Sequence, residues 1–331
     1  MDLSTTYLGF KLATPIIPGA SPMCDDIGKV KRLEDAGAPM IVMHSIFQEQ
    51  LVYEETAVNL GIDLAENSFA EALTHLPKPE EFQLGPDEYL EQVSLIKQAV
   101  SIPVVASMNG RALGWWTKYA QYIEQAGADA IELNIYDPVL DPEVSSSEVE
   151  RRIIDLVSEI RKTVKLPLAV KLSLNYTALG NFAKHLHAAG ANALVLFNRF
   201  FQADIDIEHL DLRRELMPST SAELLPRLRA VASLWGRVKM DLAVTGGVHT
   251  ATDVVKSIMA GANAVQMVTA LLEYGPAYLT ELHRELAMWL EAHEYESLSQ
   301  MRGSMSLLRT PNRAAFERGN YMKIINSWER T

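Results

Sequence analysis

Short apolar runs recur along the chain and are separated by longer amphipathic stretches. One set of four runs follows the triplet Ala-Gly-Ala: the triplets stand at 36–38, 126–128, 189–191 and 260–262, and the runs at 40–43, 130–133, 193–196 and 264–267. Glycine just past a helix end adopts the left-handed conformation that stops the helix, so each triplet predicts a helix end. A near-continuous apolar run of this length is typical of a strand buried on both faces, as in a parallel sheet.

A second set of apolar runs lies between the members of the first, at 15–17, 103–106, 167–170 and 241–244. The two sets alternate, which predicts eight strands with helices between them. Ser145 with Glu148, and Thr250 with Asp253, have the spacing of capping boxes and predict two of the helix starts. We therefore expect an α/β fold, a (β/α)8 TIM barrel. A doubly wound open sheet is the alternative, but such sheets have fewer strands, and no Gly-x-Gly-x-x-Gly or Walker A motif is present.

Two segments are longer than a minimal barrel requires. A loop over 47–86 follows the second predicted strand, and loops of that length are usually functional. The C-terminal stretch 293–331 is too apolar for a free tail, with Met301, Phe316 and Trp328 among its residues. We expect a barrel over 1–292 and a C-terminal extension over 293–331 that packs on the barrel or on a neighbouring subunit.

Composition and charge exclude several classes of protein. Forty-two acidic against 30 basic residues give a net charge of −12, the opposite of what phosphate neutralisation in a nucleic-acid binder needs. The single cysteine, Cys24, permits neither an internal disulfide nor a cysteine metal cage, and we expect no metal site. No apolar run is long enough to span a bilayer, and the N-terminus lacks the features of a secretory signal. These observations predict a cytoplasmic protein that binds neither nucleic acid nor membrane.

Polar residues stand where the predicted strands end, which in a barrel is the side of the active site. The end positions include Ser21, His44, Ser45, Asn109, Asn134, Lys171, Asn198, Thr245 and Thr269. Convergence of so many donors and acceptors in one mouth indicates a small-molecule site. Any one of them could equally be a surface or strand-end hydrogen-bonding residue.

Two strand ends are chemically specific. Gly246-Gly247 bares the backbone after the seventh strand, and Thr269-Ala270 begins a helix after the eighth, the two places where barrels often bind phosphate. The alternative for the glycine pair is a tight turn alone. Lys171 is a cation at the end of a buried strand, so it must meet an anion, a cofactor oxygen or a carboxylate such as Glu132.

Taken together, these residues resemble the dihydroorotate dehydrogenase family, in its cytosolic class 1 form, from about Leu8 to about Leu290. The resemblance rests on Pro-Ile-Ile-Pro-Gly-Ala-Ser at 15–21, Glu132-Leu133-Asn134, Val170-Lys171-Leu172, Val244-Thr245-Gly246-Gly247 with Thr252-Asp253, Ala260-Gly261-Ala262, Gln266-Met267 and Thr269-Ala270. It implies FMN in the barrel mouth, hydride transfer from dihydroorotate to flavin N5, a role in pyrimidine biosynthesis and a homodimer.

The resemblance also implies roles for individual residues. The implied FMN-binding residues are Ala20, Ser21, Ser45, Asn109, Asn134, Lys171, Ser221, Ala222, Gly246, Gly247, Thr269 and Ala270. Within this set, Lys171 would stabilise the anion that forms when the flavin is reduced. The implied substrate-binding residues are Asn134, Asn198 and Asn67.

Three positions depart from the family pattern. His44 stands where the family has lysine, Val139 where it has asparagine, and Asp137 where it has the cysteine or serine that acts as catalytic base. Asp137 could serve as general base if burial raised its pKa, or it could cap the turn at Asp-Pro. Arg111 and Arg199 could receive a substrate carboxylate or could be solvated surface residues.

The predicted function is therefore an FMN-dependent oxidoreductase that acts on CH–CH donors such as dihydroorotate. One alternative is a flavin-binding barrel that has lost this chemistry and serves as a redox partner or scaffold; another is an unrelated phosphate-binding barrel enzyme. The electron acceptor stays open among fumarate, a quinone analogue and a protein partner, because the sequence has no cysteine cluster and no nicotinamide-binding motif.

Overall fold

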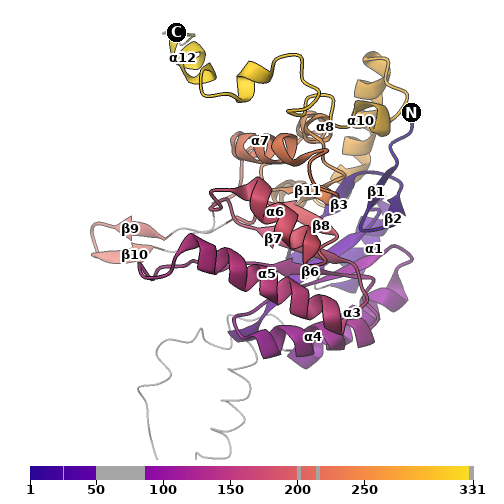
Figure 1. Ribbon diagram of the computed structural model, residues 1–331. Coiled ribbons are helices and arrows are strands. Elements are labelled where there is room, and N and C mark those ends of the chain that lie inside the picture. Colours follow the sequence, from indigo (N-terminus) through magenta and orange to yellow (C-terminus); the bar gives the residue numbers. More distant parts are fainter. Residues whose placement is uncertain (25, 50–85, 200–202, 214–216, 328–331) are drawn as a thin grey trace, which may run out of the picture.

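The computed structural model describes residues 1–24, 26–49, 86–199, 203–213 and 217–327. Eight parallel strands form one sheet, in the order β3-β12-β11-β8-β7-β6-β5-β4. The two terminal strands, β3 and β4, lie beside each other, so the sheet curls into a nearly closed barrel (Figure 1). The strands are β3 (Ile16–Pro18), β4 (Ile41–Phe47), β5 (Val104–Asn109), β6 (Ala130–Asn134), β7 (Leu168–Leu172), β8 (Ala193–Leu196), β11 (Asp241–Thr245) and β12 (Ala264–Met267). The predicted (β/α)8 barrel is confirmed; the predicted loop after the second strand lies largely outside the described residues.

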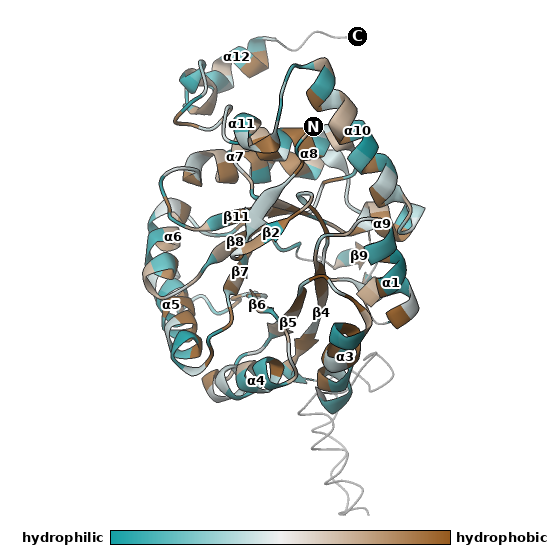
Figure 2. Ribbon diagram, turned by 90° about the vertical axis from the view of Figure 1, so that its right-hand side faces the viewer, coloured by the Kyte–Doolittle hydropathy of each residue, from teal (hydrophilic) through white to brown (hydrophobic). Residues whose placement is uncertain are grey.

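Helices surround the barrel and turn their apolar stripes toward it (Figure 2). They are α1 (Ile27–Asp35), α3 (Pro86–Ala99), α4 (Leu113–Gln125), α5 (Ser146–Thr163), α6 (Leu179–Ala188), α7 (Leu224–Leu234), α8 (Ala251–Ala260) and α10 (Tyr278–Ala292). Both predicted capping boxes are present, at the starts of α5 and α8, with the side chain and backbone of each pair bonded reciprocally. The glycines of all four Ala-Gly-Ala triplets have positive φ, from +92° to +126°, as expected where a helix stops.

One end of the barrel is closed by an N-terminal hairpin, β1 (Thr5–Tyr7) and β2 (Phe10–Leu12). Tyr7, Leu8 and Leu12 join an inner apolar cluster with small and branched residues of the strands, among them Val195 and Ala243. Because this cluster fills the amino end of the barrel, the carboxyl ends of the strands remain as the mouth.

The C-terminal extension has two parts. The first packs on the barrel: Leu298 and Met301 of α11 (Leu298–Met301) are buried, and the amides of Gly303 and Met305 donate to carbonyls of α8. The second part carries η4 (Arg313–Phe316) and α12 (Asn320–Asn326), and neither element has a buried residue. The first part therefore contacts α8, and the division of the chain into a barrel over 1–292 and an extension over 293–331 that packs on the barrel or a neighbouring subunit stays a prediction.

The described chain also contains the hairpin β9 (Asp204–Asp206) with β10 (Asp211–Arg213), the short helix α9 (Thr269–Tyr274), and the single-turn 3-10 helices η1 (Pro22–Cys24) and η3 (Ser221–Glu223). No helix within the described ranges is both long and apolar enough to cross a membrane.

His283 of α10 makes the stability of the fold depend on pH. Its ring packs against the turn at Gly37, its Nε2 has no hydrogen-bond partner among the described residues, and burial lowers its pKa. As the pH falls, the imidazole of His283 is therefore protonated first in the unfolded chain, near pH 6.5. Folding stability is full above about pH 6.5 and falls as the pH decreases below it. We expect His283→Gln to lose less stability than the parent between about pH 8 and pH 5.5 in urea unfolding. Parallel pH profiles of the two proteins would contradict this.

Candidate active site

A cavity of about 450 Å³ opens at the carboxyl ends of β3, β7, β8, β11 and β12. Its volume lies in the range of small-molecule sites. The residues proposed from the sequence that line it are Ala20, Lys171, Asn198, Arg199, Thr245, Gly246, Gly247 and Thr269. The structure thus brings together residues from five strand ends that are up to 249 positions apart in the sequence (20 to 269).

A chain of amide and hydroxyl groups extends from this cavity across the other strands of the mouth. Asn198 Nδ2 donates to Asn134 Oδ1, and Asn134 Nδ2 donates to Ser45 Oγ at 2.8 Å. Asn109 Nδ2 donates to the Asn134 carbonyl at 2.7 Å, and Ser45 Oγ lies 2.8 Å from Ser107 Oγ. These bonds fix the orientation of the Asn134 amide. Ser45, Asn109 and Asn134 do not themselves line the cavity.

Lys171 takes part in a buried charge network beneath the cavity. Its Nζ lies 3.5 Å from Oε1 of Glu132, whose side chain is 1% exposed. Glu132 also accepts from Ser107 Oγ at 3.3 Å and from Gln266 Nε2 at 2.8 Å. Lys171 therefore pairs with Glu132 and also lines the cavity. Gln266 Oε1 is buried without a hydrogen-bond partner among the described residues.

The turn after β11 can be built only with glycine. Gly246 and Gly247 have φ of +82° and +79°. A Cβ on Gly246 would lie 2.7 Å from Arg227 Nη2, and a Cβ on Gly247 would lie 2.6 Å from the Leu224 backbone nitrogen. Arg227 is 2% exposed and donates to the carbonyls of Thr245 and Glu223, and burial lowers its pKa. A buried cation therefore lies directly beneath this turn.

Hydroxyl and imidazole groups gather beside the glycine turn. Ser219 Oγ donates to Thr269 Oγ1 at 3.0 Å and lies 3.0 Å from His249 Nε2. Ser219 lines the cavity, whereas Ser221 and Ala222 are exposed and do not. Ser221 Oγ instead donates to Asp253 Oδ2, the capping carboxylate of α8.

Two further residues proposed for FMN lie next to the cavity but do not line it. Ser21 is 5% exposed, and its carbonyl accepts from the Cys24 amide. Ala270 is fully buried in α9. Asn67 lies outside the described residues.

His44 faces a helix rather than the mouth. Its ring meets the ring of Tyr89 of α3 edge-on, with 5.2 Å between centroids. The Tyr89 hydroxyl bonds to backbone groups of His44 and Ser107, and burial raises its pKa. His44 therefore does not line the cavity.

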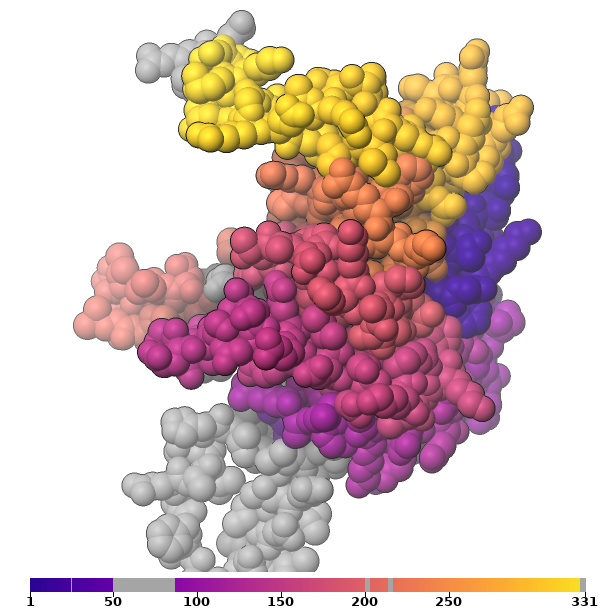
Figure 3. All heavy atoms as spheres, in the orientation of Figure 1, coloured from indigo at the N-terminus to yellow at the C-terminus, as the bar shows by residue number. Residues whose placement is uncertain are grey.

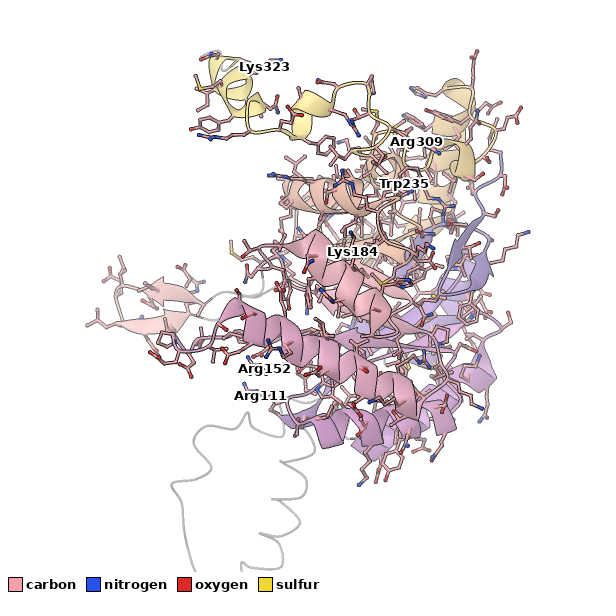
Figure 4. The ribbon with its side chains drawn as sticks, in the orientation of Figure 1. Arg111, Arg152, Lys184, Trp235, Arg309 and Lys323 are labelled. Carbon is pink, nitrogen blue, oxygen red and sulfur yellow. The ribbon has the colours of Figure 1, made fainter. Side chains whose placement is uncertain are left out.

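Of the three other candidates for substrate chemistry, Arg199 lines the cavity, whereas Asp137 and Arg111 do not. Asp137 is exposed in the loop after β6. Its negative charge acts on Tyr176: burial of the Tyr176 hydroxyl, together with the charge of Asp137, raises the pKa of Tyr176 to about 12. Arg111, labelled in Figure 4, has a side chain that is 80% exposed and lies 3.6 Å from Glu49. Arg199 is 3.0 Å from Glu223 and also donates to the carbonyls of Met217 and Pro218. Both arginines are thus already engaged by groups of their own chain.

Gln266 and Ser219 are site residues that the sequence did not identify as such. Gln266 belongs to the apolar run at 264–267 and is the one polar residue in it. A single polar side chain in a buried strand was the available signal that this residue has a role in the site. Ser219 lies two residues before the serine chosen from the sequence, in a stretch with no periodic pattern. Within the described ranges, no cluster of three or more histidine, cysteine or acidic residues could hold a metal ion.

Comparison with known proteins gives consistent matches. The sequence model of the family described as dihydroorotate dehydrogenase matches residues 82–290. The catalytic subunit of dihydroorotate dehydrogenase B (NAD(+)) from Thermoplasma volcanium is 30% identical over 310 residues, which is 91% of this chain and 98% of the relative. A putative dihydroorotate dehydrogenase A (fumarate) from Aeropyrum pernix is 25% identical over 314 residues, 91% of this chain and 97% of the relative. A Geobacter catalytic subunit of the B type is 31% identical over 232 residues, 68% of this chain and 75% of the relative.

Proposed function

The chain belongs to the dihydroorotate dehydrogenase family and is an oxidoreductase of that type, and on this premise we propose that it binds FMN in the mouth cavity and oxidises dihydroorotate in pyrimidine biosynthesis. The observation that carries the proposal is the convergence of Lys171, Gln266 and the glycine turn on one cavity. The two alternatives, a barrel without this chemistry and an unrelated phosphate-binding enzyme, are not favoured by the family assignment.

The residues present fit a flavin that bears a phosphate. At one end of the cavity, the bare turn Gly246-Gly247, the hydroxyls of Ser219 and Thr269 and the underlying Arg227 suit a dianion. Toward the barrel axis, Lys171 offers a cation, and the unpartnered Gln266 Oε1 can accept a hydrogen bond from a ring N–H. When bound, FMN supplies the hydride acceptor.

We assign the remaining steps to groups of this chain. Lys171 neutralises negative charge in the cavity, and its own position is held by Glu132. Asn198, which lines the cavity, orients the substrate, and Asn134, which accepts a hydrogen bond from the Asn198 amide, fixes the position of that amide. We assign the substrate proton to Asp137 because it occupies the family position of the base in the loop after β6; the carboxylate is exposed in the free chain, so this role requires bound substrate to cover it.

Replacing Asp137 tests that role. Asp137→Ala is expected to lower the rate of substrate-dependent flavin reduction at least about a hundredfold, the usual size of a general-base contribution. FMN content and affinity should not change, because Asp137 does not line the cavity. Single-turnover absorbance traces measure the rate, with Asp141→Ala in the same exposed loop as a control. Reduction at the parent rate would remove Asp137 from the mechanism.

The cofactor is identified by releasing it. Heat-denatured protein should yield one FMN per chain by chromatography and mass spectrometry, and riboflavin or FAD in its place would contradict the proposal. Binding of FMN to the apoprotein should also be tighter than binding of riboflavin, because the cavity carries a phosphate end.

The relatives' names bear on the electron acceptor. The Thermoplasma and Geobacter proteins are named catalytic subunits of NAD(+)-type enzymes, and the Aeropyrum protein is named for fumarate. We propose that this chain passes electrons to a partner subunit, that it works as a homodimer and that it is cytoplasmic. Steady-state turnover of the purified chain with fumarate alone would contradict the need for a partner subunit.

A further inference from the structure

A layer of polar side chains crosses the interior of the barrel between the inner apolar cluster and the cavity. Each of its four members stands two residues after a member of that cluster in the same strand, and alternate residues of a strand face the same side. The layer consists of Ser107, Glu132, Lys171 and Gln266, which follow the cluster members Val105, Ala130, Ala169 and Ala264. On the face shown in Figure 3, the helices cover the strands, so this layer is shielded from solvent on that side.

Glu132 is the acidic member of the layer, and it is buried. Its side chain is 1% exposed. Three groups approach its carboxylate: Lys171 Nζ at 3.5 Å, and the donors Ser107 Oγ at 3.3 Å and Gln266 Nε2 at 2.8 Å. Such a set suits an ionised carboxylate, which only accepts hydrogen bonds. The layer therefore holds a negative charge that water and salt screen little.

This negative charge lies one contact away from the cavity. Lys171 lines the cavity, whereas Glu132 does not. A molecule bound in the cavity therefore experiences the positive charge of Lys171 reduced by a carboxylate 3.5 Å from its ammonium. Arg199, the other cation in the described lining, is already paired with Glu223.

The pair bears on the flavin of the proposed function, on which this inference rests. A hydride from the substrate brings two electrons and one proton, so the flavin gains one negative charge on reduction, while the substrate also releases one proton to the base. A nearby cation stabilises this reduced form, and a nearby anion destabilises it. We propose that Glu132 sets the reduction potential of the bound flavin by offsetting part of the Lys171 charge. The reduced flavin is thereby a stronger electron donor to the acceptor that follows.

The midpoint potential of the flavin-loaded chain tests this role. Glu132→Gln removes the charge but keeps the size of the side chain and one acceptor oxygen. A unit charge roughly 10 Å away, at an effective dielectric constant of about 20, changes such an equilibrium more than tenfold. We therefore expect the preference for reduced over oxidised flavin to rise at least about tenfold, which for two electrons is a potential about 30 mV higher. Anaerobic titration against a redox dye at one fixed pH gives the value.

The sign of the shift separates a charge effect from a structural one. If Glu132 only held Lys171 in place, Glu132→Gln would lower the potential, as we expect of Lys171→Met. A second comparison serves where Glu132→Gln does not fold. The double variant Glu132→Gln with Lys171→Met leaves neither charge of the pair buried, and its potential should be at least about 30 mV above that of Lys171→Met alone. The matched control, Glu159→Gln, removes an exposed carboxylate of α5 and should leave the potential unchanged.

The outcomes distinguish this inference from the function on which it rests. Visible absorbance verifies that each variant carries flavin. An equal or lower potential in either comparison, in chains that carry flavin, overturns the role of Glu132 and leaves the cofactor site standing. A parent chain that binds no flavin overturns the proposed function, and this inference with it.

Discussion

Glu132→Ala is expected to destabilise the chain by about 3–5 kcal/mol, because it leaves the buried Lys171 ammonium without its counter-ion. The carboxylate is 1% exposed and also receives hydrogen bonds from Ser107 and Gln266, so the substitution breaks three interactions in the barrel interior. Urea unfolding monitored by circular dichroism measures the change.

Two comparisons separate the buried charge from other effects. Glu159→Ala, which removes an exposed partner of Lys162, should change stability by less than about 1 kcal/mol. The double variant Glu132→Leu with Lys171→Met should recover much of the loss, since apolar replacement of a buried pair is often neutral. If Glu132→Ala lowers the free energy of unfolding no more than Glu159→Ala does, the buried Lys171–Glu132 network does not stabilise the fold as described.

Gly247→Ala is expected to weaken FMN binding on the order of a hundredfold, which corresponds to about 2.7 kcal/mol. The residue has φ +79°, which costs an L side chain about 1–2 kcal/mol, and the new Cβ would lie 2.6 Å from the Leu224 nitrogen. Since the backbone of Leu224 cannot move aside as a flexible side chain could, the turn itself must shift. Quenching of FMN fluorescence by the apoprotein gives the affinity.

Gly9→Ala is the matched control for this effect. Gly9 has nearly the same φ, +83°, but a Cβ added there would have no atom within 4 Å, and it belongs to the hairpin at the closed end of the barrel. This variant should lose about 1 kcal/mol of stability and keep its FMN affinity. Equal affinities for all three proteins would show that the glycine turn does not hold the cofactor.

The strands and helices could be predicted because their signals are local. Buried parallel strands read as apolar runs, and the capping pairs Ser145–Glu148 and Thr250–Asp253 mark helix starts by spacing alone. The alternation of strands and helices along the sequence places Lys171 and Gly246 at the carboxyl ends of strands. A barrel brings all of these strand ends together at one mouth. These parts of the site follow from topology.

The orientation of His44 could not be predicted, because it depends on a register shift. Strand β4 changes register against β5 between Val42 and Ser45, and one extra residue reverses which side chains face the barrel. Counting along the run therefore assigns His44 to the mouth, whereas its ring packs against Tyr89.

Ser219 and Gln266 were missed for different reasons. Ser219 lies in an aperiodic stretch, where an offset of two residues leaves no trace in the sequence. Gln266 reads as a member of a buried strand, and only the three-dimensional structure shows that its amide bonds Glu132 while its carbonyl oxygen has no partner among the described residues.

The most direct test of the account is an anaerobic titration of the purified chain with dihydroorotate, followed by visible absorbance. We expect flavin bands in the isolated protein and their loss on addition of about one equivalent of dihydroorotate per chain, as a two-electron transfer requires. Flavin bands that persist through excess dihydroorotate would contradict the proposed substrate, and a protein that neither carries nor takes up FMN would contradict the cofactor site itself.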